Sequence, residues 1–531
     1  MKRPVLLILT AAPLLAAAID YAAEGDLWWA HVQFLADDKL EGRNTGTEGF
    51  RKAVEYVTAG FERFGLKPAG TSGYLQPVKF ETRLLVPEQS SLALVSNGKV
   101  EPLTMGTDAT LNARAGAEDT VEAPMVFVGY GMTIPEAHYD DLAGNDLHGK
   151  IAVFVNAPGP ADAPGPLKSH YSSAVERWAA MRRAGAVGIA TIQNPRIAAP
   201  GDAGGRGGRG DAQPVFELAD RALQENAGEA AAVAIHAAGA EKFFAGSGHT
   251  YAEIEKLAKE NAPLPKFPLA GALRAKTVVK RESLEAPNVV GLLEGSDRRL
   301  KNEYVVFSAH LDHVGIGRPV NGDSLYNGAM DNASGIASVL EVARLMKASG
   351  AKPKRSILFL AVTAEEKGEL GSRYFAAHPT VPEDRMVADI NLDMFLPLYQ
   401  LKYIEVQGLG ESTLGETVRA AARELGVEVQ PDNEPEQNRF IRSDQYSFIR
   451  RGVPALAFKF GYAPGSPEEK IRRDWVRERY HRPSDDLGQP VDKASAALFD
   501  RVILGLIEKV ADDAARPHWY ESSFFRRFAA Q

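Results

Sequence analysis

The segment FSAHLDHVGIG at positions 307–317 places three side chains suited to metal chemistry within four positions. His310, Asp312 and His313 follow EYVVFSA, an apolar and β-branched run of strand length. Zinc is bound in proteins by thiolate, imidazole and carboxylate groups, and this chain has no cysteine. The segment therefore indicates a metal site built from His and carboxylate side chains, with the three individual roles open at this point.

Polar side chains end several other apolar runs further along the chain. They are Asp331 before a helical pattern, Glu365 and Glu366 after SILFLAVTA, Asp393 after VADINL and His481 in RYHRPSDD. Taken singly, a strand-end aspartate is more often a helix cap or a loop acceptor. Their recurrence in chain order favours a metal centre, and the surplus of carboxylates suits a second ion, with one aspartate bridging two ions about 3.5 to 4 Å apart.

The elements that must position these residues begin at about residue 286. Six apolar runs have strand length: APNVVGLLEG, NEYVVFSAH, RSILFLAVTAEE, MVADINLDM, KYIEVQG and VPALAFKF. Apolar residues share one helical face at 336–346 and again at 414–425. This alternation predicts an α/β fold with a mixed, mostly parallel central sheet and helices on both faces, in which functional groups gather at the carboxyl ends of strands.

Two regions precede this sheet. FRKAVEYVTAGFERFGL has apolar residues at helical spacing, which predicts an amphipathic helix that stops at Gly65. Between about 85 and 285, short apolar runs alternate with Gly and Pro, which is typical of strands joined by turns. The Gly/Arg-rich stretch at 200–214 is predicted to be a solvated loop, and its Arg-Gly-Asp tripeptide is attributed to composition.

The net charge of the chain and its N-terminal residues indicate which partners to expect and where the protein is located. A net charge of -8 gives no general attraction to nucleic acid or to anionic membranes. The first residues combine Lys2 and Arg3, an apolar stretch, and small residues at Ala16 and Ala18, which predicts an export signal ending at about residue 18 or 23. We therefore expect an exported protein, periplasmic or secreted, with no membrane partner after signal removal and an oligomeric state that the sequence does not fix.

Five ordered motifs resemble those of the co-catalytic di-zinc aminopeptidases, metallopeptidase family 28: AHLDH at 309–313, MDNASG at 330–335, TAEEKGELGS at 363–372, NLDM at 391–394 and YHRPSDD at 480–486. The flanking stretches LEGRNTGTEG, PNVVGLLEGS and RSDQYSFIRRGVPAL fit as well, so the resemblance covers about residues 25 to 510. The texture of residues 120–260 is similar to the protease-associated domain that members of this family often carry as an insertion.

The resemblance implies a zinc-aminopeptidase fold of the phosphorylase/hydrolase-like type with an inserted β-rich domain. The expected division is a signal peptide at 1–23, the N-terminal part of the peptidase domain at 24–115, the inserted domain at 116–270, the catalytic di-zinc domain at 271–515 and a C-terminal tail at 516–531.

The resemblance also implies two zinc ions per chain. His310 and Asp393 are expected to hold one ion, and Glu366 and His481 the other. Asp331 is expected to bridge both ions, and the following bond to Asn332 is expected to be cis.

Further roles follow from the same resemblance. Glu365 is expected to be the general base, separated from Glu366 because neighbours on an extended segment point to opposite sides. Asp312 is expected to orient His310 through the far ring nitrogen, which leaves His313 outside the set of ligands. Asp444 and Tyr446 are expected beside the substrate, whereas Arg439 is expected to hold a loop by hydrogen bonds.

These expectations combine into an exported zinc exopeptidase, specifically an aminopeptidase that acts on peptides with a free N-terminus. Three alternatives stay open: a glutamate-carboxypeptidase-like enzyme, a glutaminyl cyclase on the same fold, and a receptor-like binding module without catalysis. The intact set of predicted ligands together with Glu365 disfavours the binding module.

Overall fold

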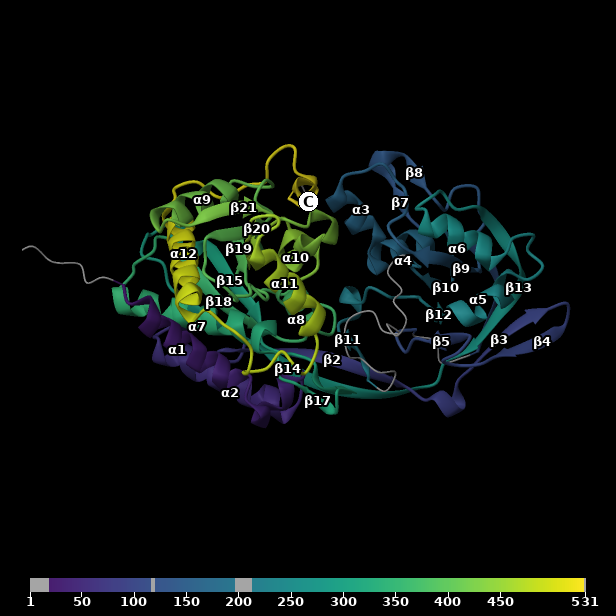
Figure 1. Cartoon of the computed structure of the whole chain (residues 1–531), viewed down its shortest axis with the longest axis horizontal. Helices are drawn as coiled ribbons and strands as arrows, with labels where there is room; N and C mark the ends of the chain where they lie inside the picture. Colours follow the sequence, from purple (N-terminus) through teal and green to yellow (C-terminus); the bar gives the residue numbers. More distant parts are fainter. Residues whose placement is uncertain (1–18, 116–119, 196–212, 530–531) are drawn as a thin grey trace, which may run out of the picture.

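The computed structural model describes residues 19–115, 120–195 and 213–529. Its strands form two large sheets, which lie in two lobes in Figure 1. The long strands β2 (Leu75–Leu85) and β14 (Val279–Leu293) run along the lower edge of both lobes and pair with each other over their common length. The predicted export signal falls largely on residues 1–18 and the Gly/Arg-rich stretch on residues 196–212, outside the described residues.

The first sheet has the strand order β11-β2-β14-β18-β15-β19-β22-β20-β21, and β1 (Lys67–Pro68) pairs with β14. Besides β2 and β14, its strands are β11 (Val215–Leu218), β15 (Tyr304–His310), β18 (Ser356–Val362), β19 (Met386–Asn391), β20 (Tyr403–Gln407), β21 (Glu428–Pro431) and β22 (Ala455–Phe460). The six predicted strands are all present. The sheet is mixed: β18, β15, β19 and β22 are parallel at its centre, and antiparallel pairs flank them on both sides.

Helices cover both faces of this sheet because its central strands are buried on both sides. Val305 and Phe307 of β15 pack in one core with α7, whereas Val306 packs in a second core on the opposite face. The first face carries α1 (Tyr21–Leu35), α2 (Glu48–Arg63), α7 (Ser334–Ser349), α9 (Leu414–Glu424) and α12 (Lys493–Asp512). The second face carries α8 (Leu370–Ala377) and α10 (Gln445–Ile449). The predicted helix near residues 50–64 is α2.

The second sheet has the order β4-β3-β13-β6-β9-β10-β12-β5. Its strands are β3 (Ser91–Ser96), β4 (Lys99–Leu103), β5 (Ala109–Leu111), β6 (Val121–Val128), β9 (Ile151–Asn156), β10 (Gly188–Gln193), β12 (Ala231–Ile235) and β13 (Lys266–Lys276). Four helices pack in this lobe: α3 (Gly165–Ser172), α4 (Ala174–Arg183), α5 (Ala237–Phe244) and α6 (Tyr251–Lys259). Two small hairpins, β7–β8 (133–140) and β16–β17 (315–326), complete the strands.

The second sheet draws on residues beyond the predicted insertion at 116–270. Strands β3 to β5 precede it, and β13 extends to Lys276, because β13 pairs with β3 on one side and β6 on the other. Its assignment to the protease-associated class stays a prediction. Within the described residues, we find no helix with the length and apolar character needed to span a bilayer.

Candidate metal centre

The predicted ligands converge where three parallel strands end at the same edge of the first sheet. His310 is the last residue of β15, Asp393 follows β19, and Glu366 follows β18. Asp331 lies in the irregular segment Ala329–Ala333 that leads into α7, and His481 follows α11 (Pro467–Glu478). Parallel strands carry their loops to a common edge, so residues 171 positions apart in sequence meet there.

The first cluster consists of His310, Asp331 and Asp393. The Nε2 atom of His310 lies 3.3 Å from Asp331 Oδ1 and 3.5 Å from Asp393 Oδ1. His310 and Asp331 are buried, and Asp393 is half-buried. These three ligand atoms face one another, as the prediction for the first ion requires.

The second cluster uses the other oxygen of Asp331. The Nε2 atom of His481 lies 3.1 Å from Asp331 Oδ2 and 3.2 Å from Glu366 Oε1. Asp331 therefore turns one carboxylate oxygen to each cluster, which is the geometry of a bridging ligand. The peptide bond between Asp331 and Asn332 is cis, as the resemblance implies.

The donor atoms fit zinc on two counts. Four bonds of 2.0 to 2.1 Å in a tetrahedron place neighbouring ligand atoms about 3.3 Å apart, close to the distances in both clusters. Asp331 Oδ2 and Glu366 Oε1 are also buried, and the neighbouring imidazole nitrogens of His481 and His313 are not aligned to donate a hydrogen bond to them. Buried carboxylate oxygens without a donor are costly unless a cation binds them, so this site suits zinc.

His313 lies closer to the second cluster than the sequence led us to expect. Its Nδ1 atom is 2.8 Å from Glu366 Oε1 and 3.9 Å from Asp331 Oδ2, and the side chain is fully buried. Gly328, with φ +64°, packs so closely that a β-carbon there would come within 2.5 Å of the imidazole ring. His313 is thus fixed in contact with the predicted ligand Glu366, although it was itself expected outside the set of ligands.

Asp312 organises the two glutamates rather than the histidine ring. Its carboxylate accepts the backbone N–H of Glu365 at 3.0 Å and that of Glu366 at 3.3 Å, and the hydroxyl of Thr45 at 3.1 Å. The Nδ1 atom of His310 contacts the backbone carbonyl of Asp312 at 3.1 Å, in place of the predicted carboxylate contact. Asp312 therefore orients His310 through its main chain and holds the glutamate turn through its side chain.

The two glutamates lie in a turn, not on the extended segment that we predicted. Ala364, just before them, has φ +56°, and the N–H groups of Gly368 and Glu369 donate to the carbonyl of Glu365 at 2.8 Å. Positive φ at a non-glycine residue is strained and is found often at functional sites. The turn still separates the two side chains, because Glu366 alone reaches the second cluster.

The electrostatics of the site also separate the two glutamates. Burial raises the pKa of Glu365 well above its usual range, and the nearby Asp393 and Asp444 add to this effect. Burial also tends to raise the pKa of Glu366, but the neighbouring His481 and His313 hold this pKa well below the usual range. A poised base and a charged ligand have these opposite requirements.

Three further residues that support the site were not singled out from the sequence. The carboxylate of Asp485 accepts the backbone N–H groups of Met330 at 2.9 Å and Asp331 at 3.0 Å. Buried Lys459 donates to the carbonyl of Asp393, and burial lowers its pKa to about 8. Buried Arg43 donates to four backbone carbonyls, including that of Leu311. Their only signal in the sequence is that they lie within the quoted motifs or strands, as Asp485 does in YHRPSDD.

Asp444 lies deep beside the centre. The residue is fully buried, neither carboxylate oxygen has a hydrogen-bond partner among the described residues, and burial raises its pKa to about 8. The nearby hydroxyl of Ser372 acts against this rise in the pKa, although its hydrogen bonds go to Ser447 and the carbonyl of Glu369. Asp444 is therefore an acceptor without a donor, as a predicted substrate-side acid would be.

Tyr446 and Arg439 are both engaged elsewhere. The hydroxyl of Tyr446 lies 2.7 Å from Nδ1 of His170 in α3, so this predicted substrate residue joins the two lobes. Arg439 pairs with Glu405 at 3.2 Å and with Glu434, which is the loop-holding role expected from the sequence.

A family profile matches the part of the chain that contains the predicted ligands. Residues 288–507 match the profile described as Peptidase family M28, a range that includes every predicted ligand. This part of the chain, less than half of its length, is similar to peptidase family M28.

Two curated relatives illustrate the likeness. This chain is 27% identical over 228 residues to aminopeptidase YwaD of Bacillus subtilis, a match covering 40% of this chain and 44% of that protein. It is 28% identical over 188 residues to carboxypeptidase Q of rat, covering 35% of each. The chain therefore spans less than half the length of either relative.

A solved structure shows the same fold over nearly the whole length. The aminopeptidase from Aneurinibacillus sp. strain AM-1 superposes with a TM-score of 0.55 at 22% identity, covering 93% of this chain and 95% of that one. The shared fold thus includes the second lobe.

Proposed function

We propose that this chain is an exported zinc-dependent aminopeptidase that binds two zinc ions and releases N-terminal residues from peptides. The observation that carries the proposal is the carboxylate of Asp331, whose two oxygens face two separate buried clusters of imidazole and carboxylate groups. His310 and Asp393 would complete one site, and Glu366 and His481 the other.

The chain's own residues supply the proton transfer. Zinc, when bound, lowers the pKa of a coordinated water toward about 7 and polarises the scissile carbonyl. Glu365 takes the proton of the attacking water and returns it to the leaving amine, a role worth roughly 100- to 10,000-fold in rate. Asp312 fixes Glu365 for this transfer by accepting its backbone N–H.

Asp444 favours the aminopeptidase over the carboxypeptidase. Its buried carboxylate lacks a donor, and the ammonium group of a free peptide N-terminus would provide one. The aminopeptidase of B. subtilis and the superposed structure support this choice, whereas the match to carboxypeptidase Q keeps the alternative under test.

The experiment uses a dipeptide with a free amine beside its N-acetylated form. An aminopeptidase cleaves the free peptide and leaves the blocked one intact. Preference for the acetylated peptide would favour the carboxypeptidase, and cyclisation of N-terminal glutamine without hydrolysis would favour the cyclase. A protein that binds no zinc and cleaves no aminoacyl p-nitroanilide would be a binding module.

Export rests on the pattern of the first residues and has its own test. Expression of the full chain in a bacterial host, followed by fractionation and N-terminal sequencing, should give a shortened protein outside the cytoplasm. A full-length cytoplasmic product would contradict this part of the proposal.

A further inference from the structure

A cavity of about 1070 Å³ lies between the two lobes beside the metal centre. One wall includes Lys367, which directly follows Glu366, and Tyr446 of α10. The opposite wall is formed by the end of α3 and by α4. The contact between His170 and Tyr446 joins the two walls at 2.7 Å.

The size of the cavity bears on substrate length. Sites for small ligands typically measure about 300 to 1,000 Å³, so this cavity is larger than one amino-acid residue requires. Because it starts next to Glu366 and extends between the lobes, it offers room for the chain that follows the scissile bond.

Two arginines that line the cavity lack a carboxylate partner, whereas the lining residues Arg373 and Arg450 both pair with Glu225. From one wall, Arg182 donates to the carbonyl of Ala227 at 3.1 Å; from the other, Arg442 donates to that of Gln437 at 3.4 Å. Across the described ranges, no carboxylate lies within 4.0 Å of either guanidinium group. Two such arginines in one cavity are notable in a chain with a net charge of -8.

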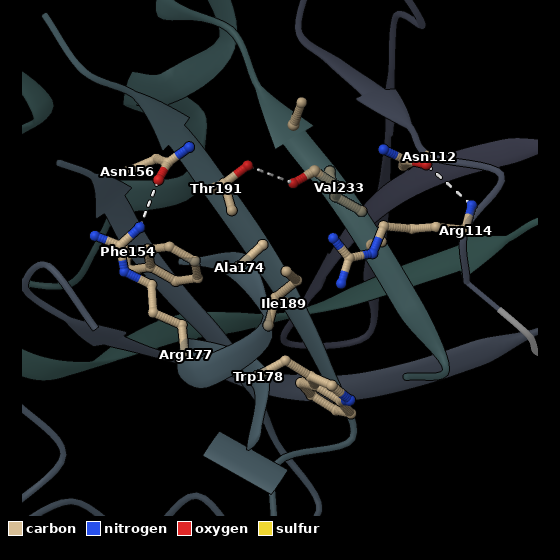
Figure 2. A pocket seen from close by; sticks show the side chains of 12 residues that line it. Asn112, Arg114, Phe154, Asn156, Ala174, Arg177, Trp178, Ile189, Thr191 and Val233 are labelled. Carbon is tan, nitrogen blue, oxygen red and sulfur yellow. Dashed lines mark hydrogen bonds between the residues drawn. The ribbon is translucent and has the colours of Figure 1, made fainter. Parts of the chain in front are cut away.

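A smaller recess of about 150 Å³ extends the same cavity into the second lobe, and it shares Asn156, Ala174 and Trp178 with the cavity. Figure 2 shows Arg177 and Arg114 on opposite sides of this recess. Arg177 is buried, donates to Asn156 Oδ1 at 2.5 Å, and has an Nε atom without a partner in the described chain. Arg114 pairs with buried Glu229 at 2.8 Å, so the positive charge that this recess adds comes from Arg177.

We propose that this cavity binds the leaving part of a peptide substrate several residues long, and that Arg182 and Arg442 bind the C-terminal carboxylate of that part. The inference rests on the proposed aminopeptidase activity and adds the substrate class: short peptides with a free C-terminus. Guanidinium groups bind carboxylates through charge-assisted hydrogen bonds, which are stronger than neutral ones.

The test compares the zinc-loaded wild-type enzyme with the double variant Arg182→Gln/Arg442→Gln. The substrates are an alanyl p-nitroanilide, tetra-alanine, its C-terminal amide, and the amide of Ala-Ala-Glu-Ala. The double variant should raise KM for tetra-alanine about tenfold, as expected for losing charge-assisted contacts, with kcat unchanged. The anilide and the tetra-alanine amide should keep their wild-type KM. A raised KM for the glutamate-containing amide as well would assign the arginines to acidic side chains and overturn the choice of the C-terminus.

Arg423→Gln is the matched control, because this arginine is exposed on α9 and does not line the cavity. An unchanged KM for tetra-alanine in the double variant, or an equal loss on all four substrates, would overturn the inference. If the wild type cleaves none of the substrates, the proposed function fails separately. In that case, calorimetry compares the affinity of the wild type for tetra-alanine with its affinity for the amide. Equal affinities would refute the proposal that the cavity binds the C-terminal carboxylate.

Discussion

The carboxylate of Asp312 accepts the backbone N–H of Glu365 at 3.0 Å. This contact, with a second one to the N–H of Glu366, ties the end of β15 to the turn after β18. Asp485 holds the segment before α7 in the same way, through the N–H groups of Met330 and Asp331. Two buried aspartates thus fix the main chain that carries the proposed base and the proposed bridging ligand.

Asp312→Asn should lower kcat by about 10- to 100-fold, the usual cost of losing a partner that orients metal ligands. The amide keeps the size of the side chain but replaces one of the two accepting oxygens by a donor, so one backbone N–H faces another donor. Steady-state kinetics on an aminoacyl p-nitroanilide measure the effect. Thr45→Val, which removes only the hydroxyl contact to Asp312, should cost much less. Equal losses in the two variants would argue against the role of Asp312 in holding the turn.

His313→Ala should weaken the binding of one zinc ion by about 10- to 100-fold. The imidazole contacts Glu366 at 2.8 Å, and its removal frees the ligand carboxylate to move. Zinc retention against a chelator series measures this directly. His313→Asn, with a smaller polar side chain, should retain zinc better than the alanine variant. If both variants retained both ions as the wild type does, the contact would have no part in metal binding.

Because His170 is buried in its contact with Tyr446, we expect the free energy of unfolding to fall in acid. Burial lowers the pKa of His170 to about 4, and the charges of Arg450 and Arg527 act in the same direction against Glu136. The unfolded chain, with a histidine pKa of about 6.5, binds more protons between pH 6.5 and 4. Neutral His170 therefore makes its full contribution to the free energy of unfolding above pH 6.5, and this contribution is lost as the pH falls toward 4.

Thermal unfolding between pH 7.5 and 4.5 measures this loss, which we expect to be about 1 to 3 kcal/mol. His170→Gln should be less stable at neutral pH and should show a shallower decrease in acid. A variant with the same slope as the wild type would assign the acid sensitivity to other groups.

Much of this architecture was predictable from the sequence. Parallel strands buried on both faces leave uninterrupted apolar runs, so β15, β18 and β19 could be located together with the polar residues that end them. His310, Asp331, Glu366, Asp393 and His481 stood in recognisable motifs, and the structure brings all five together.

The supporting contacts were less predictable for a physical reason. The turn at Glu365 depends on a positive φ at Ala364, a residue type that gives no signal of it. Asp312 and Lys459 form hydrogen bonds with backbone groups of distant segments. Because nearly all residues have the same backbone groups, the sequence does not show which of them a side chain will contact. The set of strands in the second sheet was not predictable either, because β13 pairs with β3, which is distant from it in the sequence.

The most direct test of the central claim is the turnover of Glu365→Gln on a panel of aminoacyl p-nitroanilides, at a zinc content matched to the wild type. The wild type should bind two zinc ions per chain and hydrolyse at least one member of the panel. The variant should keep both ions and lose at least about 100-fold in kcat, because it can no longer accept the proton. Turnover within a few-fold of the wild type at full zinc occupancy would contradict Glu365 as the base.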